Sequence, residues 1–425
     1  MARWIYTLCF YLLMPLILLR LGYRALHAPA YARRLGERFG FVGAGPGAGC
    51  LWVHAVSVGE TIAAQALVKT LQQRYPQRAI VLTTTTPTGS ERVQALFADS
   101  VSHCYAPYDL PGSVQRFLAR MQPAALIIME TELWPNTIHY CAQGGVAVLL
   151  ANARLSAKSA RGYQRFAALS RPMVQQLDAV AAQSPMDGER FEALGLAPQR
   201  LQVTGSIKFD ISLPPALQRN AEQLRSTLTT AAAQRLVVVA ASTHEGEEAM
   251  LLQALAGFSA AEVLLILVPR HPERFERVLA LCQQRGLQTV RRSSGAPVNA
   301  DTQVWVGDTM GELLLFCGCA DIVFVGGSLV VHGGHNLLEP AAWGRAIVTG
   351  SSLYNFLDIS DKLTGAGALT VVEDADELSM QLSALIKTGD RRRQMGAAAL
   401  QVVAENRGAL AQLLALVETV LPPST

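Results

Sequence analysis

Short apolar runs alternate with stretches of mixed polarity through the first half of the chain. The stretches between them, such as 113–120 and 187–194, are predicted to form helices. An alternation of strands and helices is typical of a parallel sheet that helices cover on both faces. The apolar runs predicted to form its strands are 51–54, 79–82, 125–129, 146–150, 179–182 and 201–203.

A second series with the same alternation fills the other half of the chain. Its predicted helices include 272–284 and 376–386, and an Ala- and Leu-rich stretch at 395–420 is also predicted to be helical. The segment ISLPPALQRN at 211–220 contains two prolines and separates the two series, so we predict a linker there. The strands predicted for the second series are 236–241, 263–268, 304–306, 322–325, 346–349 and 369–372.

These patterns predict two doubly wound, Rossmann-like α/β domains in tandem. A chain of 425 residues is too long for one ordinary core, which agrees with two domains. Ligands of such sheets bind beyond the carboxyl ends of the strands, and two sheets face to face would form a cleft with one substrate on each side. The predicted segments are an N-terminal anchor at 1–30, a first domain at 31–210, the linker at 211–220, a second domain at 221–405 and a C-terminal helix at 406–425.

The chain begins with an apolar run that carries no charge from Trp4 to Leu19 and is interrupted by Pro15. These 16 residues are slightly fewer than the roughly 20 that span a bilayer. Arg20 and Arg24 follow directly, and the first 40 residues contain six arginines against one acid. This composition favours a monotopic or marginally spanning anchor whose basic residues contact anionic lipid headgroups.

Three other arrangements of this segment compete with that anchor. A cleaved signal peptide would use Ala28 and Ala30, but arginines separate these small residues from the apolar run. A fully spanning helix would be short and positively charged on both flanks, and an apolar helix packed against the protein body stays open. By the positive-inside rule, either membrane arrangement leaves the globular part in the cytoplasm.

Charge and cysteine usage argue against nucleic-acid binding and against a fold held by zinc or disulfides. The net charge is only +3 and no Lys- and Arg-rich run is interleaved with aromatic residues, so we expect no nucleic-acid partner. The seven cysteines lack the paired spacing of a zinc site or a disulfide framework, which indicates a reducing compartment.

Polar residues recur where the predicted strands end, in both halves of the chain. SVGE at 57–60 places Glu60 at the start of a helix, where the helix dipole alone would favour a negative charge. GGHNLLEPA at 333–341 combines paired glycines, which let backbone approach a ligand, with a helix start that offers N–H groups to a phosphate. Glu339 could accept hydrogen bonds from ribose hydroxyls or simply compensate the helix dipole.

Nine segments, in order along the chain, resemble the motifs of the 3-deoxy-D-manno-octulosonic acid (Kdo) transferases of lipopolysaccharide synthesis. APAYARR at 28–34 extends the likeness into the N-terminal anchor. The resemblance implies a GT-B glycosyltransferase with two Rossmann-like domains, no cofactor and no catalytic metal. Such an enzyme inverts the configuration at the anomeric carbon. It implies CMP-Kdo as the donor, the lipid A precursor lipid IVA as the acceptor, and action at the cytoplasmic face of the bacterial inner membrane, in contact with its lipids. The nine segments are SVGE at 57–60, TTTTPTGSERV at 83–93, METELWPN at 129–136, ANARLS at 151–156, TGSIKFD at 204–210, STHEGEE at 242–248, VPRHPERF at 268–275, GDTMGEL at 307–313 and GGHNLLEPA at 333–341.

The resemblance also implies roles for individual residues. Glu60 matches the general base that deprotonates the acceptor hydroxyl. Glu130 and Lys208 match positions thought to stabilise the transition state, with Glu132 as a rival of Glu130. Leu337 departs from the family pattern, which usually has proline at this position. The residues that match contacts to CMP are Pro269, Arg270, Met310, Gly311, Glu312, Asn336, Leu337, Leu338 and Glu339.

Other functions stay open at this point. A different GT-B transferase would use another activated sugar, and a membrane-tethered nucleotide-binding protein would bind without turnover. A dehydrogenase would need a G-x-G-x-x-G fingerprint, which we do not find. D-A-D at 374–376 is predicted to cap a helix rather than to bind a metal. His244, His271, His332 and His335 lack the spacing of metal ligands, and the first two are candidates for lining the donor pocket.

Overall fold

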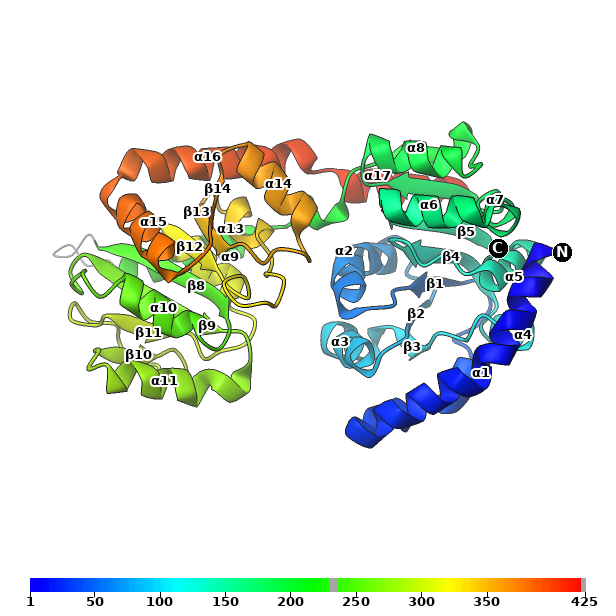
Figure 1. The fold of residues 1–425 in the computed structure, drawn as a ribbon, viewed down its shortest axis with the longest axis horizontal. Coiled ribbons are helices and arrows are strands. Elements are labelled where there is room, and N and C mark those ends of the chain that lie inside the picture. The colour runs from blue at the N-terminus through cyan, green and yellow to red at the C-terminus, as the bar shows by residue number, and fades with distance from the viewer. Residues whose placement is uncertain (229–234, 422–425) are drawn as a thin grey trace. The chain divides into compact units, whose positions relative to one another are not determined.

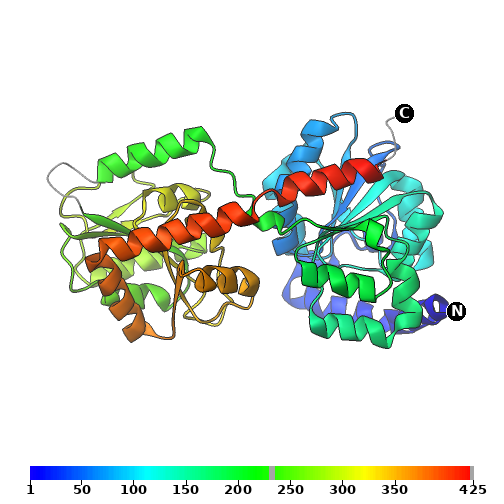
Figure 2. The same ribbon diagram turned by 90° about the horizontal axis from the view of Figure 1, so that it is seen from above.

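The computed structural model describes residues 1–228 and 235–421, and the chain divides into two compact units. The first unit comprises Met1–Asp210 and Arg407–Thr425, and the second comprises Ile211–Asn406. Each unit contains one parallel sheet of seven strands with helices on both faces (Figure 1, Figure 2). The predicted fold class, two doubly wound Rossmann-like domains, is confirmed.

The sheet of the first unit has the strand order β3-β2-β1-β4-β5-β6-β7. The winding reverses between β1 (Cys50–His54) and β4 (Pro123–Met129), and ligands of open parallel sheets bind at such a switch point. The other strands are β2 (Ile80–Thr84), β3 (Ser102–Tyr105), β5 (Ala147–Ala153), β6 (Ala179–Ala182) and β7 (Leu201–Val203), and the covering helices are α2 (Val58–Arg74), α3 (Pro87–Phe97), α4 (Pro111–Met121), α5 (Pro135–Gln143), α6 (Ala157–Arg165), α7 (Ala167–Val174) and α8 (Pro185–Ala193).

The sheet of the second unit repeats this plan with the order β10-β11-β9-β8-β12-β13-β14. Its switch point lies between β8 (Leu236–Thr243) and β12 (Ile322–Val325). The other strands are β9 (Val263–Pro269), β10 (Thr289–Arg291), β11 (Val304–Val306), β13 (Ala346–Gly350) and β14 (Leu369–Val372), and the helices are α9 (Pro215–Leu228), α10 (Glu247–Ala254), α11 (Phe275–Gln284), α12 (Leu313–Cys319), α13 (Leu338–Ala342), α14 (Leu357–Gly365), α15 (Ala375–Lys387) and α16 (Gly389–Asn406).

Two strands, β3 and β10, are not predicted by the hydrophobic pattern. Both are sheet edges, and a strand at an edge keeps one side open to other contacts. Ser102 is exposed, and His103 and Thr289 are half-buried, so neither strand needs the continuous apolar run that marks the central strands. The central strands of both sheets were predicted because they are buried on both faces and read as continuous apolar runs.

The segment predicted as a linker is partly helical. Helix α9 begins at Pro215, inside 211–220, because the missing N–H of proline costs little in the first turn of a helix. The D-A-D segment behaves as predicted, since the Asp374 side chain accepts hydrogen bonds from the N–H groups of Asp376 and Glu377 and caps α15.

The C-terminal stretch 395–420, predicted to be helical with a domain boundary at 405/406, contains two helices that belong to different units. Helix α16 ends at Asn406, and α17 (Ala409–Val420) begins after Gly408, whose φ of +97° breaks the helix. Asp210 accepts hydrogen bonds of 2.7 Å from the N–H groups of Gly408 and Leu410. These bonds hold the start of α17 on the first unit, where it packs against α2, β5 and β6.

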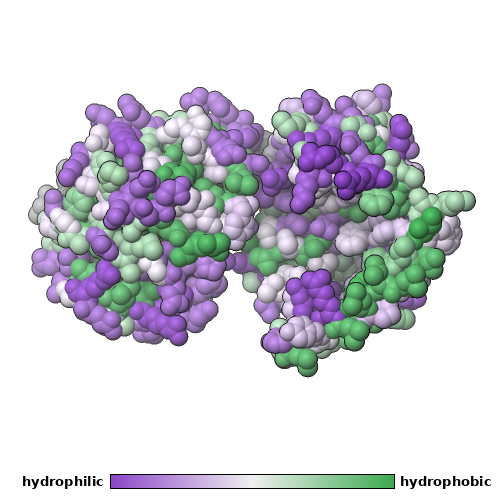
Figure 3. Space-filling view, viewed as in Figure 1, coloured by the Kyte–Doolittle hydropathy of each residue, from purple (hydrophilic) through white to green (hydrophobic). Residues whose placement is uncertain are grey.

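The chain starts with helix α1 (Ala2–His27), which is long and apolar enough by length and composition to cross a membrane. Hydrophobic side chains gather along it on the surface of the first unit (Figure 3). All seven cysteines are free, and only Cys9 on this helix is exposed.

Candidate active site

Glu60 stands in the first turn of α2, directly beyond the carboxyl end of β1. The Ser57 side chain caps this helix and accepts a hydrogen bond from the Glu60 N–H at 3.3 Å. In return, the Glu60 carboxylate accepts from the Val56 N–H at 2.5 Å and from the Ser57 hydroxyl at 3.2 Å. This reciprocal arrangement is a form of capping box, and it fixes the carboxylate at the switch point of the first sheet.

The surroundings of Glu60 suit a group that accepts a proton near neutral pH. Burial raises the pKa of Glu60 to about 7, helped by the negative charges of Glu132 and Glu130 and opposed by the bonds from Val56 and Ser57. A general base works best when its pKa lies near the working pH. Burial, with the neighbouring charge of Glu130, also raises the pKa of Glu132, so the edge holds three crowded acids.

Glu130 follows β4 on the other side of the switch point, and its backbone is strained. Its φ of +58° lies in the left-handed region, which side chains other than glycine rarely adopt. The Glu130 carboxylate pairs with the ammonium group of Lys208 at 2.9 Å, and both side chains are partly exposed. The structure thus pairs the two residues that the resemblance linked to the transition state. Glu132, the rival of Glu130, is not part of this ion pair.

Lys208 lies in the short helical turn η5 (Ile207–Phe209). Asn152, at the end of β5, accepts a hydrogen bond from the Ile207 N–H at 3.1 Å and holds this turn. Asn152 also has a left-handed φ of +53°, and its buried side-chain nitrogen has no hydrogen-bond partner within residues 1–228 and 235–421. Strained residues that the fold maintains are concentrated at functional sites.

In the second unit, the carboxylate of Glu247 organises the switch point between β8 and β12. The fully buried side chain accepts a hydrogen bond from the N–H of His244 at 2.9 Å. It also accepts from three successive N–H groups of the loop after β12, at 2.8, 3.0 and 3.1 Å, which belong to Gly327, Ser328 and Leu329. The segment STHEGEE at 242–248 contains Glu247, but its resemblance to a family motif did not indicate this role.

The same edge gathers four histidines that are dispersed in sequence. The ring of His244 stacks on those of His332 and His335, with centroids 4.2 and 5.1 Å away, and meets His271 edge-on at 5.4 Å. The Nε2 atoms of His244 and His335 are 2.8 Å apart, within hydrogen-bond distance. Burial and nearby positive groups lower the pKa of His244 to about 4 and that of His335 to about 3, so both rings are neutral at pH 7.

All three segments predicted to contact CMP follow strands of this sheet. Pro269 ends β9, and the Arg270 N–H donates to the Thr243 carbonyl at 3.0 Å, which ties it to the end of β8. The Asn336 amide donates to the Glu339 carboxylate at 3.1 Å. Burial raises the pKa of Glu339, and the bond from Asn336 and the positive charge of Arg270 oppose this rise. Arg270 and Glu339 therefore lie within electrostatic range of each other.

The third segment, Met310 to Glu312, follows β11, the neighbour of β9. Met310 is exposed, and Gly311 has a φ of +85°, which favours glycine. The Glu312 carboxylate makes a two-point ion pair with Arg292, at 2.7 and 3.0 Å, and this pairing lowers its pKa. The exposed backbone of this loop, rather than the engaged carboxylate, is the part open to a ligand.

The side chains of Leu337 and Leu338 are buried at the start of α13. The N–H of Leu338 donates to the Asn336 side chain at 3.1 Å. Among the residues that the structure describes, no group of three or more His, Cys, Asp or Glu side chains has a geometry that could hold a metal ion.

Comparison with known proteins shows which proteins this chain resembles. Residues 33–211 match the family described as 3-deoxy-D-manno-octulosonic-acid transferase (kdotransferase). A 3-deoxy-D-manno-octulosonic acid transferase of Haemophilus influenzae is 44% identical over 99% of each chain. The enzyme of that name from Bordetella pertussis is 37% identical over 98% of this chain and 99% of its own.

Solved structures with little sequence identity share the fold. MurG of Acinetobacter baumannii is 15% identical with a TM-score of 0.54, covering 88% of this chain and 100% of its own. The glycotransferase of kitacinnamycin is 12% identical with a TM-score of 0.55, covering 89% and 100%. These neighbours are consistent with the GT-B arrangement of two Rossmann-like domains. Full-length identity to Kdo transferases shows that the chain belongs to the 3-deoxy-D-manno-octulosonic acid transferase family and is a glycosyltransferase.

Proposed function

We propose that this enzyme transfers Kdo from CMP-Kdo to lipid IVA, with inversion, at the cytoplasmic face of the bacterial inner membrane. The observation that carries the mechanism is Glu60, a carboxylate at the switch point of the first sheet whose pKa is raised to about 7. At neutral pH a large fraction of the Glu60 side chains is ionised and can accept a proton. The ionised form also binds a proton more tightly than a carboxylate with an ordinary pKa does.

In the proposed reaction, Glu60 takes the proton of an acceptor hydroxyl while the hydroxyl oxygen attacks C2 of Kdo. The bond between C2 and the phosphate oxygen breaks, and CMP leaves with the bonding electrons. A single displacement of this kind inverts the configuration at C2. Lys208 supplies positive charge for the anionic donor, and Glu130 holds the ammonium group in place through the 2.9 Å pair.

The donor is proposed to bind at the carboxyl edge of the second sheet. Arg270 offers a planar cation to the phosphate or the base. Pro269, Met310 to Glu312 and Asn336 to Glu339 complete the proposed contacts to CMP, with Glu339 accepting from the ribose hydroxyls. Support comes from Pro269 at the end of β9, from the loop after β11 that holds Met310 to Glu312, and from Asn336 to Glu339 at the start of α13 in the connection after β12.

Mass spectrometry of the lipid product tests the reaction. Purified full-length protein is incubated with CMP-Kdo and lipid IVA, and wild type is compared with Glu60→Gln, which keeps the size of the side chain. We expect wild-type products heavier by whole Kdo residues, and their loss in Glu60→Gln. The matched control is Glu132→Gln, at the same crowded edge, which should retain transfer.

Two outcomes would contradict parts of the proposal. Transfer that survives in Glu60→Gln would remove Glu60 as the base. Wild-type protein that binds UDP in preference to CMP, and accepts no Kdo donor, would favour a GT-B transferase of another activated sugar.

A further inference from the structure

The N-terminal end of helix α1 is held on the globular part of the first unit by polar contacts. The Arg3 guanidinium donates to the Asn136 side chain at 2.8 Å. Thr7 and Asn136, both buried, exchange hydrogen bonds of 3.0 and 3.2 Å. The hydroxyl of Tyr6 bonds to the buried carboxylate of Asp109. Helix α1 therefore begins against the amino-terminal end of α5 and is not a free extension.

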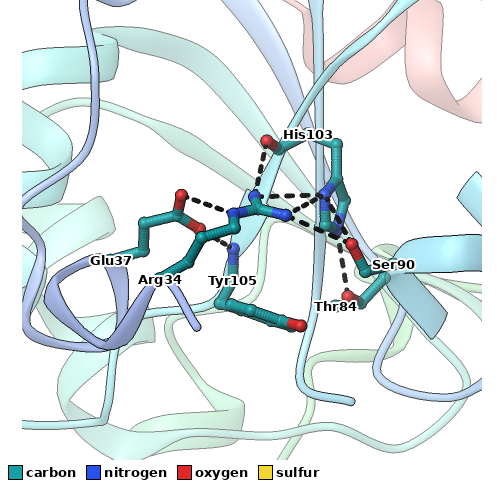
Figure 4. Close-up of polar contacts among 6 residues, drawn as sticks. All are labelled: Arg34, Glu37, Thr84, Ser90, His103 and Tyr105. Carbon is teal, nitrogen blue, oxygen red and sulfur yellow. Dashed lines mark hydrogen bonds and ion pairs between the residues drawn. The ribbon is translucent and has the colours of Figure 1, made fainter. Parts of the chain in front are cut away.

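The chain that follows α1 is held on the same unit by a second polar cluster (Figure 4). Arg34 bonds to Glu37 at 2.8 Å and reaches Ser90 and the backbone carbonyl of His103 at 3.2 and 3.0 Å. The Glu37 carboxylate also accepts from the Tyr105 N–H at 2.8 Å, at the end of β3. The anchored residue Arg34 lies only seven positions after the last residue of α1.

Arg38 strengthens this second attachment. Its side chain is buried, donates to the Thr85 carbonyl at 2.9 Å, and lies 4.2 Å from the centre of the Tyr105 ring. The bond to the carbonyl and the contact with the aromatic face fix this guanidinium on the first unit. Both flanks of α1 are thus joined to one folded unit by contacts that use buried polar groups.

These two attachments conflict with a helix that crosses a bilayer. A helix of 26 residues extends about 39 Å, and a spanning arrangement would place its ends on opposite sides of a hydrocarbon layer about 30 Å thick. Asn136, which holds the first end, and Tyr105, which bonds to Glu37 in the region after the second end, belong to the same unit. A unit with a polar surface cannot lie on both sides of the membrane.

We propose that α1 lies flat in the interface of an anionic phospholipid bilayer and attaches the first unit to the membrane surface without crossing it. This inference rests on the membrane attachment in the proposed function and specifies its geometry. The face of α1 turned away from the protein is apolar, and its exposed large side chains are Trp4, Ile5, Leu8, Tyr11, Leu12, Leu13, Leu16, Leu18, Leu19, Tyr23 and Leu26 (Figure 3).

The charges around this face favour anionic lipids. Arg20, Arg24 and Arg33 are exposed on and directly after the helix. Glu37, the one acid among the first 40 residues, is engaged by Arg34. Trp4, Tyr11 and Tyr23 are side chains that prefer the headgroup region. A bilayer containing phosphatidylglycerol therefore matches both the apolar surface and the positive charge.

Accessibility of the N-terminus to a membrane-impermeant maleimide tests the proposal. Ala2→Cys is made in a Cys9→Ser background, where the other six native cysteines are buried. The control is Ser226→Cys, an exposed position on the second unit. In inside-out inner-membrane vesicles, whose cytoplasmic face is outside, we expect both variants to react. In right-side-out spheroplasts we expect neither to react. If Ala2→Cys is labelled in spheroplasts but not in inside-out vesicles, the helix spans the membrane and the proposal is overturned.

A disulfide between Thr7→Cys and Asn136→Cys gives a second, independent measurement. Their native side-chain atoms approach to 3.0 Å, so we expect mild oxidation of inside-out vesicles to join them in protein that still transfers Kdo. The two single variants serve as controls for folding and activity. Active single variants whose combination gives no disulfide in the membrane would show that α1 leaves the protein, against the proposal.

Flotation with phosphatidylglycerol vesicles separates this inference from the proposed function. Wild type that transfers Kdo to detergent-dispersed lipid IVA but does not float with vesicles would refute the flat attachment and leave the reaction intact. Protein that floats, with Ala2→Cys labelled from the cytoplasmic side but without transfer, would retain the attachment and refute the reaction.

Discussion

The carboxylate of Glu130 and the ammonium group of Lys208 form an ion pair of 2.9 Å beside the switch point of the first sheet. The two residues are separated by 77 intervening positions and lie on different elements, one after β4 and one in the turn after β7. Glu130 adopts a left-handed backbone conformation to reach this position. In the proposed reaction, Glu130 orients the cation of Lys208, which gives an acid a role in a site for anionic substrates.

Lys208→Met is expected to lower kcat by roughly a hundredfold, a typical cost for removing a group that stabilises developing charge. Glu130→Gln should lower kcat less, because Lys208 remains but is less firmly oriented. The free energy of unfolding should change by less than about 1 kcal/mol in either variant, since the pair is partly exposed. Steady-state kinetics and thermal unfolding measure both effects.

The double variant provides the control for this pair. If Glu130 acts by positioning Lys208, Glu130→Gln should add little to the loss already caused by Lys208→Met. Fully additive losses would mean that Glu130 acts on the substrates directly.

The pH dependence of kcat/KM should follow the ionisation of Glu60. Its pKa is raised to about 7, and only the ionised carboxylate can accept a proton, so activity should be highest above this pH. Below it, kcat/KM should fall about tenfold per pH unit as the carboxylate becomes protonated. Initial rates across a pH series, with protein stability checked at each pH, give the midpoint.

Glu132→Gln is expected to move that midpoint to lower pH. The negative charge of Glu132 is one of the groups that raise the pKa of Glu60, and its removal makes the ionised form easier to reach. The direction of the shift is the decisive observation in the same pH series. An unchanged midpoint would mean that another group controls the rate.

Glu247→Gln should destabilise the second unit and weaken the binding of CMP. The native carboxylate accepts four backbone N–H groups, whereas an amide has one acceptor oxygen and brings a donor toward the same N–H groups. Each buried N–H left unpaired costs about 1–3 kcal/mol. Urea unfolding and titration calorimetry with CMP measure the two effects.

Glu245→Gln is the matched control for that variant, because Glu245 is exposed and only two positions away. It should change the free energy of unfolding by less than about 0.5 kcal/mol. Equal losses in the two variants would indicate a general charge effect at the start of α10 and not the organised loop.

Asp210→Asn should loosen the docking of α17 on the first unit. The native carboxylate accepts from two N–H groups at the start of the helix, where a negative charge is also favoured by the helix dipole. We expect a loss of about 1–2 kcal/mol in the free energy of unfolding. Hydrogen exchange should rise first in α17, and an exchange pattern identical to wild type would disprove this role for Asp210.

Much of the fold could be predicted because its central strands are buried on both faces. The runs around Trp52 and Phe324 are continuously apolar for that reason, and they gave the strands and the tandem arrangement. The edge strand that contains Ser102 and His103 lacked this signal. The break at Gly408 has no signal of its own in the hydrophobic pattern, because an Ala- and Leu-rich sequence favours helix on either side of it.

The sequence by itself determined the residue types at the strand ends, including the acid at Glu60 and the cation at Lys208, because short motifs encode them locally. Tertiary structure decided what these groups do to one another. The pKa of Glu60 depends on Glu130 and Glu132, which come from a neighbouring strand end. The stacking of His244 on His335 likewise joins segments that share no spacing in sequence. Electrostatic interaction and packing depend on distance in space, and only the folded sheets bring these side chains together.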